Sequence, residues 1–510
     1  MSKLFRAAML VTIFSVITRA LGFLMKIILS RSLTPSLLGE YQLAMSIFSV
    51  MLTLISSGLP LITSRKVAYY SNEDTQKAYK STSAGLIISL IISILFSILL
   101  FIFEDVLCEM FASETIGAMV VSLAPALIFS SVYSILRGAL WGQKRFFMIS
   151  FTELFEQLIR IIFLIILLAI PISNFDAGTK ATFSLSIACI FSGILVFILY
   201  FKSGNKIVNP KGQILPVIKE STSITLARTA SSIVQMLIAF IIPLRLTTFG
   251  YTEEQAMAEF GIVTGMALPL ITIPGTFISS IAVALVPEIS AQTTNIDNDD
   301  QIKNRDLLKK QISIALSAAL IISFMCVPAF LALGHPIAQI VFNNFRAGTY
   351  ITAGSCLMIT MGLTQITSSI LNAIGLEIKA LKNYCIGAAS LIACIYFLPK
   401  YIGAMSLVVA MLSLSIISGL LGLAMLKKRK LLSANLSVTT FKLVIITMVS
   451  SLITYFTYAI VSKFITMFFA TAIAGIISLV SFFALCYAMN IVTIKSFFSS
   501  KIFKKSKKKN

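Results

Sequence analysis

The sequence predicts an all-α membrane protein with fourteen transmembrane helices. Hydrophobic residues make up 57% of the 510-residue chain, charged residues make up only 12%, and the mean hydropathy is +0.95. Soluble domains carry about 25% charged residues, so this composition cannot cover a water-exposed surface. Stretches of about 20 apolar residues match the ~30 Å hydrocarbon core at 1.5 Å per residue. The predicted spans are residues 7–30, 41–64, 82–103, 117–140, 151–171, 180–201, 222–245, 260–286, 311–333, 350–373, 383–399, 402–426, 441–461 and 466–489.

The distribution of basic residues predicts that both termini lie in the cytoplasm. When the loops alternate from a cytoplasmic N-terminus, the cytoplasmic segments contain 31 of the 41 Lys and Arg residues and the external segments contain six. This split follows the positive-inside rule. The predicted external loop around Glu104, Asp105, Glu109 and Glu114 contains no Lys or Arg. Since topology accounts for most of the +21 net charge, we expect no nucleic-acid partner.

Two similar halves are predicted, both in the same orientation. Ser134–Gly142 closes the fourth span and Ser369–Gly375 closes the tenth, while Thr18–Ala20 in the first span matches Ala227–Thr229 in the seventh. Six helices separate the matching elements, which predicts parallel six-helix repeats around a central cleft that holds the substrate. The predicted parts are a first half at 1–201, a cytoplasmic linker at 202–221, a second half at 222–430, two extra C-terminal helices at 431–490 and a basic cytoplasmic tail at 491–510.

The first helix of each half carries the candidate substrate-binding residues. Arg19 lies in the middle of the first span, where an arginine costs at least ~2.5–3.5 kcal/mol unless it faces protein or water. Lys26 follows seven residues later on almost the same helical face, and Arg228 and Gln235 repeat this spacing in the seventh span. A guanidinium gives bidentate, charge-assisted hydrogen bonds to a diphosphate. The structural alternative is that each arginine pairs with a buried carboxylate or with helix-end carbonyls, and that Lys26 extends outward.

The fifth span carries three charged residues, Glu153, Glu156 and Arg160. Glu156 precedes Arg160 by four residues, and Glu153 lies a turn before Glu156, a spacing that favours ion pairing within the helix. These carboxylates are the most deeply placed protonatable groups that the sequence predicts. Glu153, Glu156 and Arg160 are therefore the candidates for ion coupling.

No motif points to a cofactor, a metal or a catalytic site. The seven cysteines lack CxxC spacing and are expected to be small apolar side chains, and the chain has a single histidine. A membrane glycosyltransferase, the enzyme alternative, would need catalytic carboxylates on an external loop or domain. The predicted external loops are short and show no such arrangement, so we expect a protein without enzymatic activity.

Several segments resemble the stage V sporulation protein B family. In the first half these are Ile17–Phe23, Leu38–Gln42 and Gly58–Arg65. Around the seventh and eighth spans they are Phe249–Glu254, Phe260–Pro269 and Ala284–Ser290. This family belongs to the multidrug/oligosaccharidyl-lipid/polysaccharide exporter (MOP) superfamily, which also contains lipid II flippases and polysaccharide flippases.

The resemblance implies a flippase for an undecaprenyl-diphosphate-linked sugar. The first candidate is lipid II, the peptidoglycan precursor for spore cortex or cell wall, moved by alternating access in the cell membrane of an endospore-forming Gram-positive bacterium. It also implies that Arg19 faces the central cavity. The second cavity arginine of lipid II flippases falls near Met25, and Lys26 lies on a face shifted from it by about 100°. A monomer is expected, with cell-wall synthases as partners and anionic lipids at the basic tail, at roughly 1 kcal/mol per basic residue.

Two alternatives stay open within the superfamily: a cation-coupled multidrug exporter, and a flippase for teichoic acid or capsular polysaccharide precursors. The first and seventh spans contain no Asp or Glu. Their ionisable groups are cations, so the predicted cleft attracts a diphosphate and repels an organic cation. This charge favours a flippase over a drug exporter.

Overall fold

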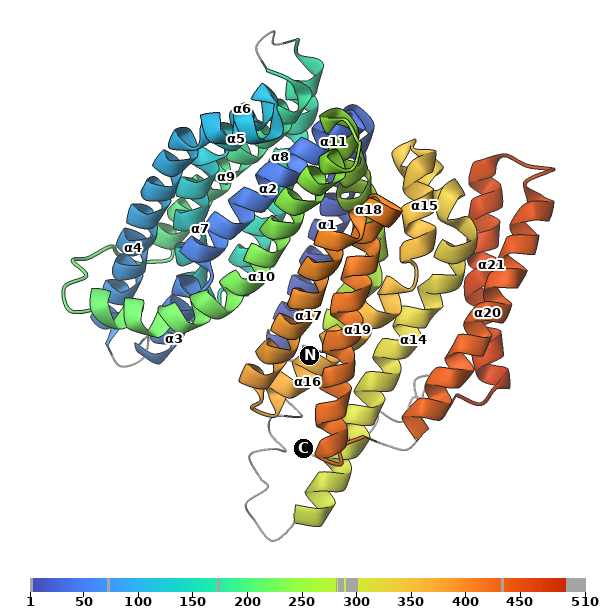
Figure 1. Ribbon diagram of the computed structural model, residues 1–510. Coiled ribbons are helices and arrows are strands. Elements are labelled where there is room, and N and C mark those ends of the chain that lie inside the picture. Colours follow the sequence, from blue (N-terminus) through green and yellow to red (C-terminus); the bar gives the residue numbers. More distant parts are fainter. Residues whose placement is uncertain are drawn as a thin grey trace. The chain divides into compact units, whose positions relative to one another are not determined.

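The structure is all-helical, as the composition predicts. The computed structural model describes residues 3–70, 74–171, 175–280, 301–432 and 435–491, together with Ala282 and Ile289, and the regular elements of these residues are all helices (Figure 1). Contacts group the chain into two units, Met1–Gly261 and Ile262–Asn510.

The first unit contains eleven helices among the described residues. They are α1 (Lys3–Ser32), α2 (Pro35–Ser56), α3 (Leu59–Tyr70), α4 (Thr75–Ile102), α5 (Glu104–Phe111), α6 (Glu114–Ser122), α7 (Ala124–Gly142), α8 (Phe146–Ala169), α9 (Ala177–Lys202), α10 (Ile214–Thr248) and α11 (Glu253–Gly261).

The described helices of the second unit begin with a π-helix. They are η1 (Ile262–Ala267), α12 (Leu268–Ile271), α14 (Gln301–Phe342), α15 (Phe345–Gly354), α16 (Leu357–Ala373), α17 (Glu377–Phe397), α18 (Pro399–Ile402), α19 (Met405–Lys428), α20 (Asn435–Val461) and α21 (Met467–Ala488).

Polar N-cap residues set the start of several long helices. Thr34, Asp74 and Asp176 each accept a hydrogen bond from the backbone N–H three residues later, which satisfies one of the free donors at the start of α2, α4 and α9. These caps stand in the short connections between apolar stretches, and α4 begins at Thr75, before the apolar stretch that starts at residue 82.

Eleven helices among the described residues are long and apolar enough to cross a membrane, or up to thirteen if two bent helix pairs each count as one span. The bent pairs are Glu253–Ile271 with Ile273–Ser280, at 41°, and Phe345–Gly354 with Leu357–Ala373, at 51°. The predicted spans 260–286 and 350–373 therefore contain a bend that hydropathy does not reveal.

The predicted span 151–171 corresponds to α8. At 24 residues, α8 is about 36 Å long, enough to cross a bilayer. It differs from the apolar helices because it contains three charged residues, Glu153, Glu156 and Arg160. Whether α8 is the fourteenth span stays a prediction.

Two predicted connections are helical. The predicted external loop around Glu104 and Glu114 contains α5 and the start of α6. The predicted linker 202–221 ends in a helix, since α10 already begins at Ile214. In both places polar residues that are good helix formers continue or add helical turns outside the apolar stretches.

Helix α7 lies against α3, α4 and α9 in the first unit. A Cβ atom at Gly138 would lie 2.5 Å from the carbonyl oxygen of Pro60, and one at Gly142 would lie 2.5 Å from that of Ser64. Small residues four apart allow such close helix packing in membranes. The segment Ser134–Gly142, which predicted the repeat, thus contains the packing surface between α7 and α3.

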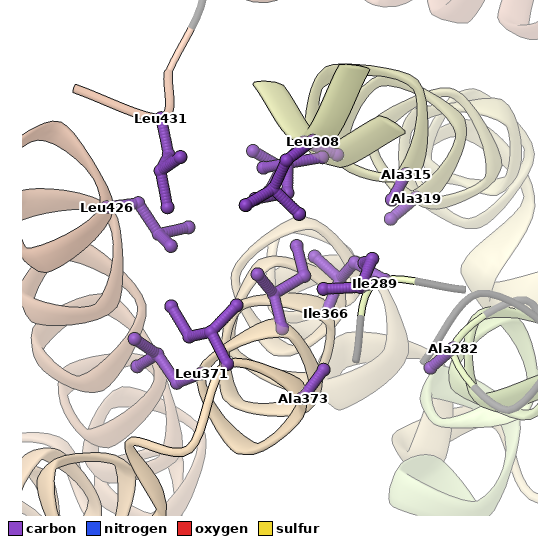
Figure 2. Close-up of a cluster of buried hydrophobic side chains, with 14 of the residues drawn as sticks. Ala282, Ile289, Leu308, Ala315, Ala319, Ile366, Leu371, Ala373, Leu426 and Leu431 are labelled. Atoms are coloured by element: carbon purple, nitrogen blue, oxygen red, sulfur yellow. The ribbon is translucent and has the colours of Figure 1, made fainter. Parts of the chain in front are cut away.

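A buried apolar cluster joins α14, α16 and the end of α19 in the second unit. Figure 2 shows Ile366 and Leu371 of α16 in this cluster with Leu308 of α14 and Leu426 of α19. The cluster holds one face of α16, and another face of the same helix lines a cavity described below.

The contact units differ from the predicted halves at the position of α10. We assigned residues 222–245 to the second half, but α10 packs against α2 and α3 of the first unit. A Cβ atom at Gly58 would lie 2.4 Å from the carbonyl oxygen of Ser221, and the hydroxyls of Thr53 and Ser232 are 2.9 Å apart. These contacts explain why the contact boundary falls after Gly261. The repeat itself stays a prediction.

Two parts of the predicted layout lie outside the described residues. The basic tail 491–510 is described only at Ile491. Of the family-like segment Ala284–Ser290, only Ile289 is described.

Candidate functional site

Arg19 and Lys26 lie on α1 with exposed side chains. Seven residues of α-helix correspond to about 10 Å along the axis, so both cations lie on nearly the same face about two turns apart. Val16 and Leu24 beside them are also exposed, at 61% and 45%. The candidate cations therefore belong to an unburied face of α1.

Helix α1 packs against α8. Phe14 of α1 meets Phe147 of α8 edge to face, with ring centroids 5.7 Å apart. Phe147, Phe151 and Phe155 then stack along α8, with centroids 6.3 and 6.4 Å apart. This aromatic series gives α8 a regular face near α1, and Arg160 follows farther along α8.

Lys26 on α1 and Arg160 on α8 lie on two helices that pack against each other, and the positive charge of Arg160 acts on Lys26. The Nη2 of Arg160 donates a hydrogen bond of 2.8 Å to the hydroxyl of Tyr41 on α2. Its Nε is buried without a hydrogen-bond partner among the described residues. The ion pairs among the described side chains include neither Lys26 nor Arg160. Both cations are therefore suited to contact an anion.

The predicted pairing of Arg160 with Glu156 is not the observed geometry. The ion pairs among the described side chains do not include Glu156 with Arg160. Arg160 donates a hydrogen bond to Tyr41 on α2 instead. The spacing of four residues therefore does not produce an ion pair, although the positive charge of Arg160 acts on the Glu156 carboxylate.

Glu153 forms an ion pair with Arg137 on the neighbouring helix α7, not with Arg160. Seven residues separate Glu153 from Arg160, about 10 Å along the helix axis and outside ion-pair reach. Sequence reasoning did not single out Arg137, which lies at the end of the predicted span 117–140. The structure places Arg137 inside α7, half-buried. Its position within the Ser134–Gly142 segment was the available signal.

Arg228 is exposed on α10 and donates a hydrogen bond of 3.2 Å from Nη1 to the carbonyl oxygen of Ser57. Ser57 is the C-cap of α2, where the chain breaks before α3. This contact is the helix-end alternative that the sequence left open for Arg228. Gln235, two turns farther along α10, is also exposed.

The structure brings together only part of the predicted set. Lys26 and Arg160 lie on the packed helices α1 and α8. Helix α10, with Arg228 and Gln235, packs mainly against α2 and α3. The helices that carry the two predicted pairs therefore have different main packing partners in the first unit.

The chemistry of the candidate site is that of binding. Its side chains include an ammonium group, a guanidinium group and the phenol of Tyr41, while the carboxylate of Glu153 is already ion-paired with Arg137. Among the described residues, no group of three or more His, Cys, Asp and Glu side chains could hold a metal ion. Cations and hydroxyl donors suit recognition of an anionic ligand.

Comparisons with known proteins add sequence and fold relationships. The family model described as polysaccharide biosynthesis protein matches residues 4–292. Stage V sporulation protein B of Bacillus subtilis (strain 168) is 24% identical over 387 residues, which cover 73% of this chain and 73% of that protein.

Two solved structures share the fold at low sequence identity. The lipid II flippase MurJ in an inward closed conformation has a TM-score of 0.74 at 15% identity, covering 95% of this chain and 100% of that one. An inward-facing multidrug resistance MATE family transporter of the MOP superfamily has a TM-score of 0.65 at 17% identity, covering 81% and 94%. The fold is thus that of MOP superfamily transporters.

Proposed function

This chain belongs to the polysaccharide biosynthesis protein family, and we propose that it is a flippase for an undecaprenyl-diphosphate-linked sugar. It is a multi-pass membrane transporter of the MOP superfamily and not an enzyme. Lipid II, which the structural neighbour MurJ is named for, is the first candidate substrate. Translocation by alternating access requires no bond to be made or broken.

One observation carries this proposal: the cations Lys26 and Arg160 lie on the packed helices α1 and α8, and neither belongs to an ion pair among the described side chains. A diphosphate between them would replace repulsion with two attractive contacts and offer an acceptor to the unpaired Nε of Arg160. Arg19, two turns away on α1, would extend the cationic face toward a second phosphate or the headgroup.

Arg228 and Gln235 receive a secondary role in this proposal. Arg228 already donates to the end of α2, so its first function is to hold α10 against the break between α2 and α3. Because its side chain is also exposed, it can offer further N–H donors to a substrate.

We assign ion coupling to Glu156, with Glu153 held in its pair with Arg137. The Glu156 carboxylate interacts with Arg160 and therefore competes with a diphosphate for this cation. Protonation of Glu156 removes that competition. Ion binding and substrate binding would then be linked through one guanidinium.

A multidrug exporter is the second candidate, favoured by the carboxylates of α8 and by the fold shared with the MATE transporter. Its cationic substrates would meet Lys26 and Arg160, which repel them. Flippases for teichoic acid or capsular precursors use the same diphosphate chemistry and belong to the first proposal.

We also propose the remaining features that the sequence predicts. They are fourteen spans, two parallel repeats, cytoplasmic termini, anionic lipids at the tail, cell-wall synthases as partners, a monomer, and the cell membrane of an endospore-forming Gram-positive bacterium.

The test is reconstitution of the purified protein in liposomes with labelled lipid II and competing lipid-linked sugars. Arg19→Ala should reach the membrane in normal amounts and lose most translocation, about tenfold or more for a lost charge-assisted contact. Val16→Ala, on the same exposed face, is the control and should transport normally. Normal transport by Arg19→Ala would remove Arg19 from the diphosphate site. Absence of lipid II transport by the native protein, with ethidium efflux instead, would support the drug exporter.

A further inference from the structure

A cavity of about 460 Å³ lies within the second unit. Its walls come from the turn and helix that follow α12, from α16, from α17 and from α19. The volume falls in the range of about 300–1,000 Å³ that small-molecule sites occupy. This cavity plays no part in the diphosphate site proposed above.

Three polar side chains on its walls are available to a ligand. Gln365 and Ser368 of α16 and Tyr384 of α17 line the cavity. Each is half-buried, and none has a side-chain hydrogen-bond partner among the described residues. By contrast, the nearby Thr364 hydroxyl donates to the carbonyl oxygen of Ser415 at 2.7 Å. Amide and hydroxyl groups that no protein side chain engages can form hydrogen bonds with a ligand in the cavity.

The wall is open at Gly275. A Cβ atom there would contact only Oε1 of Gln365, at 3.2 Å. At Gly362, elsewhere on the wall, a Cβ atom would lie 2.1 Å from the hydroxyl of Ser323, so that glycine is required for packing. Gly275 instead leaves room directly in front of the unpaired Gln365 amide.

The lining excludes several classes of ligand. It contains no Asp, Glu, Lys or Arg, so neither an organic cation nor a diphosphate finds a counter-charge. A prenyl tail would cover the Gln365 amide and two hydroxyls without giving them hydrogen bonds. A neutral polyhydroxyl ligand satisfies these groups, and Met358 and Met361 offer polarisable contacts to its C–H faces.

We propose that this cavity binds the uncharged sugar of the transported lipid-linked saccharide through Gln365, Ser368 and Tyr384. The proposal rests on the proposed function, which supplies the class of substrate.

The test compares two lipids that differ only in the sugar. Full-length protein in lipid nanodiscs is titrated with undecaprenyl diphosphate and with undecaprenyl diphosphate carrying an uncharged hexosamine disaccharide. Gly275→Leu, which fills the open wall, should weaken binding of the sugar-bearing lipid about tenfold, equivalent to one or more lost hydrogen bonds to the ligand. Binding of undecaprenyl diphosphate should not change.

Two further variants distinguish loss of sugar binding from a general loss of folding. Gln365→Leu removes the amide without adding bulk and should reproduce the selective loss. Gly475→Leu on α21, where a Cβ atom has no neighbour within 4 Å, is the matched control and should bind both lipids as the native protein does. Arg19→Ala should weaken binding of both lipids, which separates the diphosphate contact from the sugar contact.

Each remaining outcome is decisive. Unchanged binding of the sugar-bearing lipid to Gly275→Leu and Gln365→Leu, or an equal loss for both lipids, overturns the assignment of the cavity and leaves the flippase proposal standing. Ethidium binding that only Gly275→Leu abolishes assigns the cavity to an organic cation. A native protein that binds neither lipid contradicts the flippase proposal and the cavity assignment together.

Discussion

The cations Lys26 and Arg160 lie on the packed helices α1 and α8 of the first unit. A hydrogen bond to Tyr41 holds one end of the Arg160 guanidinium in place. The guanidinium plane is thereby oriented while its Nε stays without a partner among the described residues. Because the Arg160 guanidinium is oriented before binding, less side-chain entropy is lost when a ligand binds. A diphosphate would therefore gain charge compensation and a preoriented N–H donor.

Removing the carboxylate at position 156 should strengthen binding of the substrate. Glu156→Gln keeps the shape of the side chain and removes the charge that competes for Arg160. Binding of lipid II to the nanodisc-embedded protein should tighten about fivefold or more, the size of a modest coupling between sites. In the native protein, binding should strengthen as the pH falls and Glu156 takes up a proton. In Glu156→Gln this pH dependence should disappear.

Glu153→Gln is the matched control for that experiment. Glu153 lies one turn away on α8 but is ion-paired with Arg137. Its loss should leave the pH dependence of lipid II binding in place, because the competition at Arg160 is unchanged. Weaker lipid II binding by Glu156→Gln, or a pH dependence that persists in it, would contradict the linkage through Arg160.

The sequence could predict where the charges lie along each helix, but not what they contact. The seven-residue spacing predicts that Arg19 and Lys26 share one face of α1, and both side chains are exposed. For Arg160 the spacing suggested Glu156, because a single helix offers only neighbours three or four residues away. The structure adds α2, which supplies Tyr41, and α7, which pairs Arg137 with Glu153. Such partners depend on helix packing, which local spacing does not contain.

At the scale of helices, the segment Ser134–Gly142 that predicted the repeat also brings α7 into close contact with α3. Gly138 and Gly142 bring the backbone of α7 against that of α3. The same helix carries Arg137 toward α8, so the α3–α7 contact also positions the ion pair with Glu153. A change in the packing of α7 against α3 should therefore also displace Arg137 and weaken its ion pair with Glu153 of α8.

Gly138→Leu should destabilise the first unit. A Cβ atom at this position would already lie 2.5 Å from the carbonyl oxygen of Pro60, and backbone cannot yield as a flexible side chain does. Overpacking of this kind costs about 1–3 kcal/mol or more. We expect a lower melting temperature of the detergent-solubilised protein than for the native chain. Gly475→Leu adds the same bulk to an open position and should melt like the native protein. Equal melting temperatures for the two variants would show that α7 and α3 are not tightly packed.

Hydropathy identified the helices better than their breaks. The predicted span 41–64 crosses from α2 to α3 at Ser57 and Gly58, and the span 350–373 bends by 51° between α15 and α16. Both breaks occur inside apolar sequence, where a window average does not change. The direction of the chain there depends on contacts such as Gly58 with Ser221, which come from a distant segment.

At the scale of the whole chain, sequence repeats and contacts divide the protein at different places. The repeat predicts that the second half begins at residue 222, while the contacts assign α10 and α11 to the first unit. The two divisions describe different properties: the repeat concerns similarity between segments, and the contact units concern which helices pack together. A helix such as α10 can belong to one by sequence and to the other by packing.

The topology can be tested with two cysteines placed on either side of α8, in a chain whose seven native cysteines have been replaced. Residues 114 and 206 are exposed, whereas Asn205 is buried and hydrogen-bonded to Tyr200, so Lys206 is the better labelling position. Three predicted spans, 117–140, 151–171 and 180–201, separate the two residues. An odd number of crossings places them on opposite sides.

Glu114→Cys should be labelled from outside by an impermeant maleimide, and Lys206→Cys only after permeabilisation. The 31-to-6 charge split places the segment around Lys206 in the cytoplasm. The reverse pattern would invert the orientation. Labelling of both residues from one side would mean that α8, with its three charged residues, does not cross the membrane, and the count of fourteen spans would be wrong.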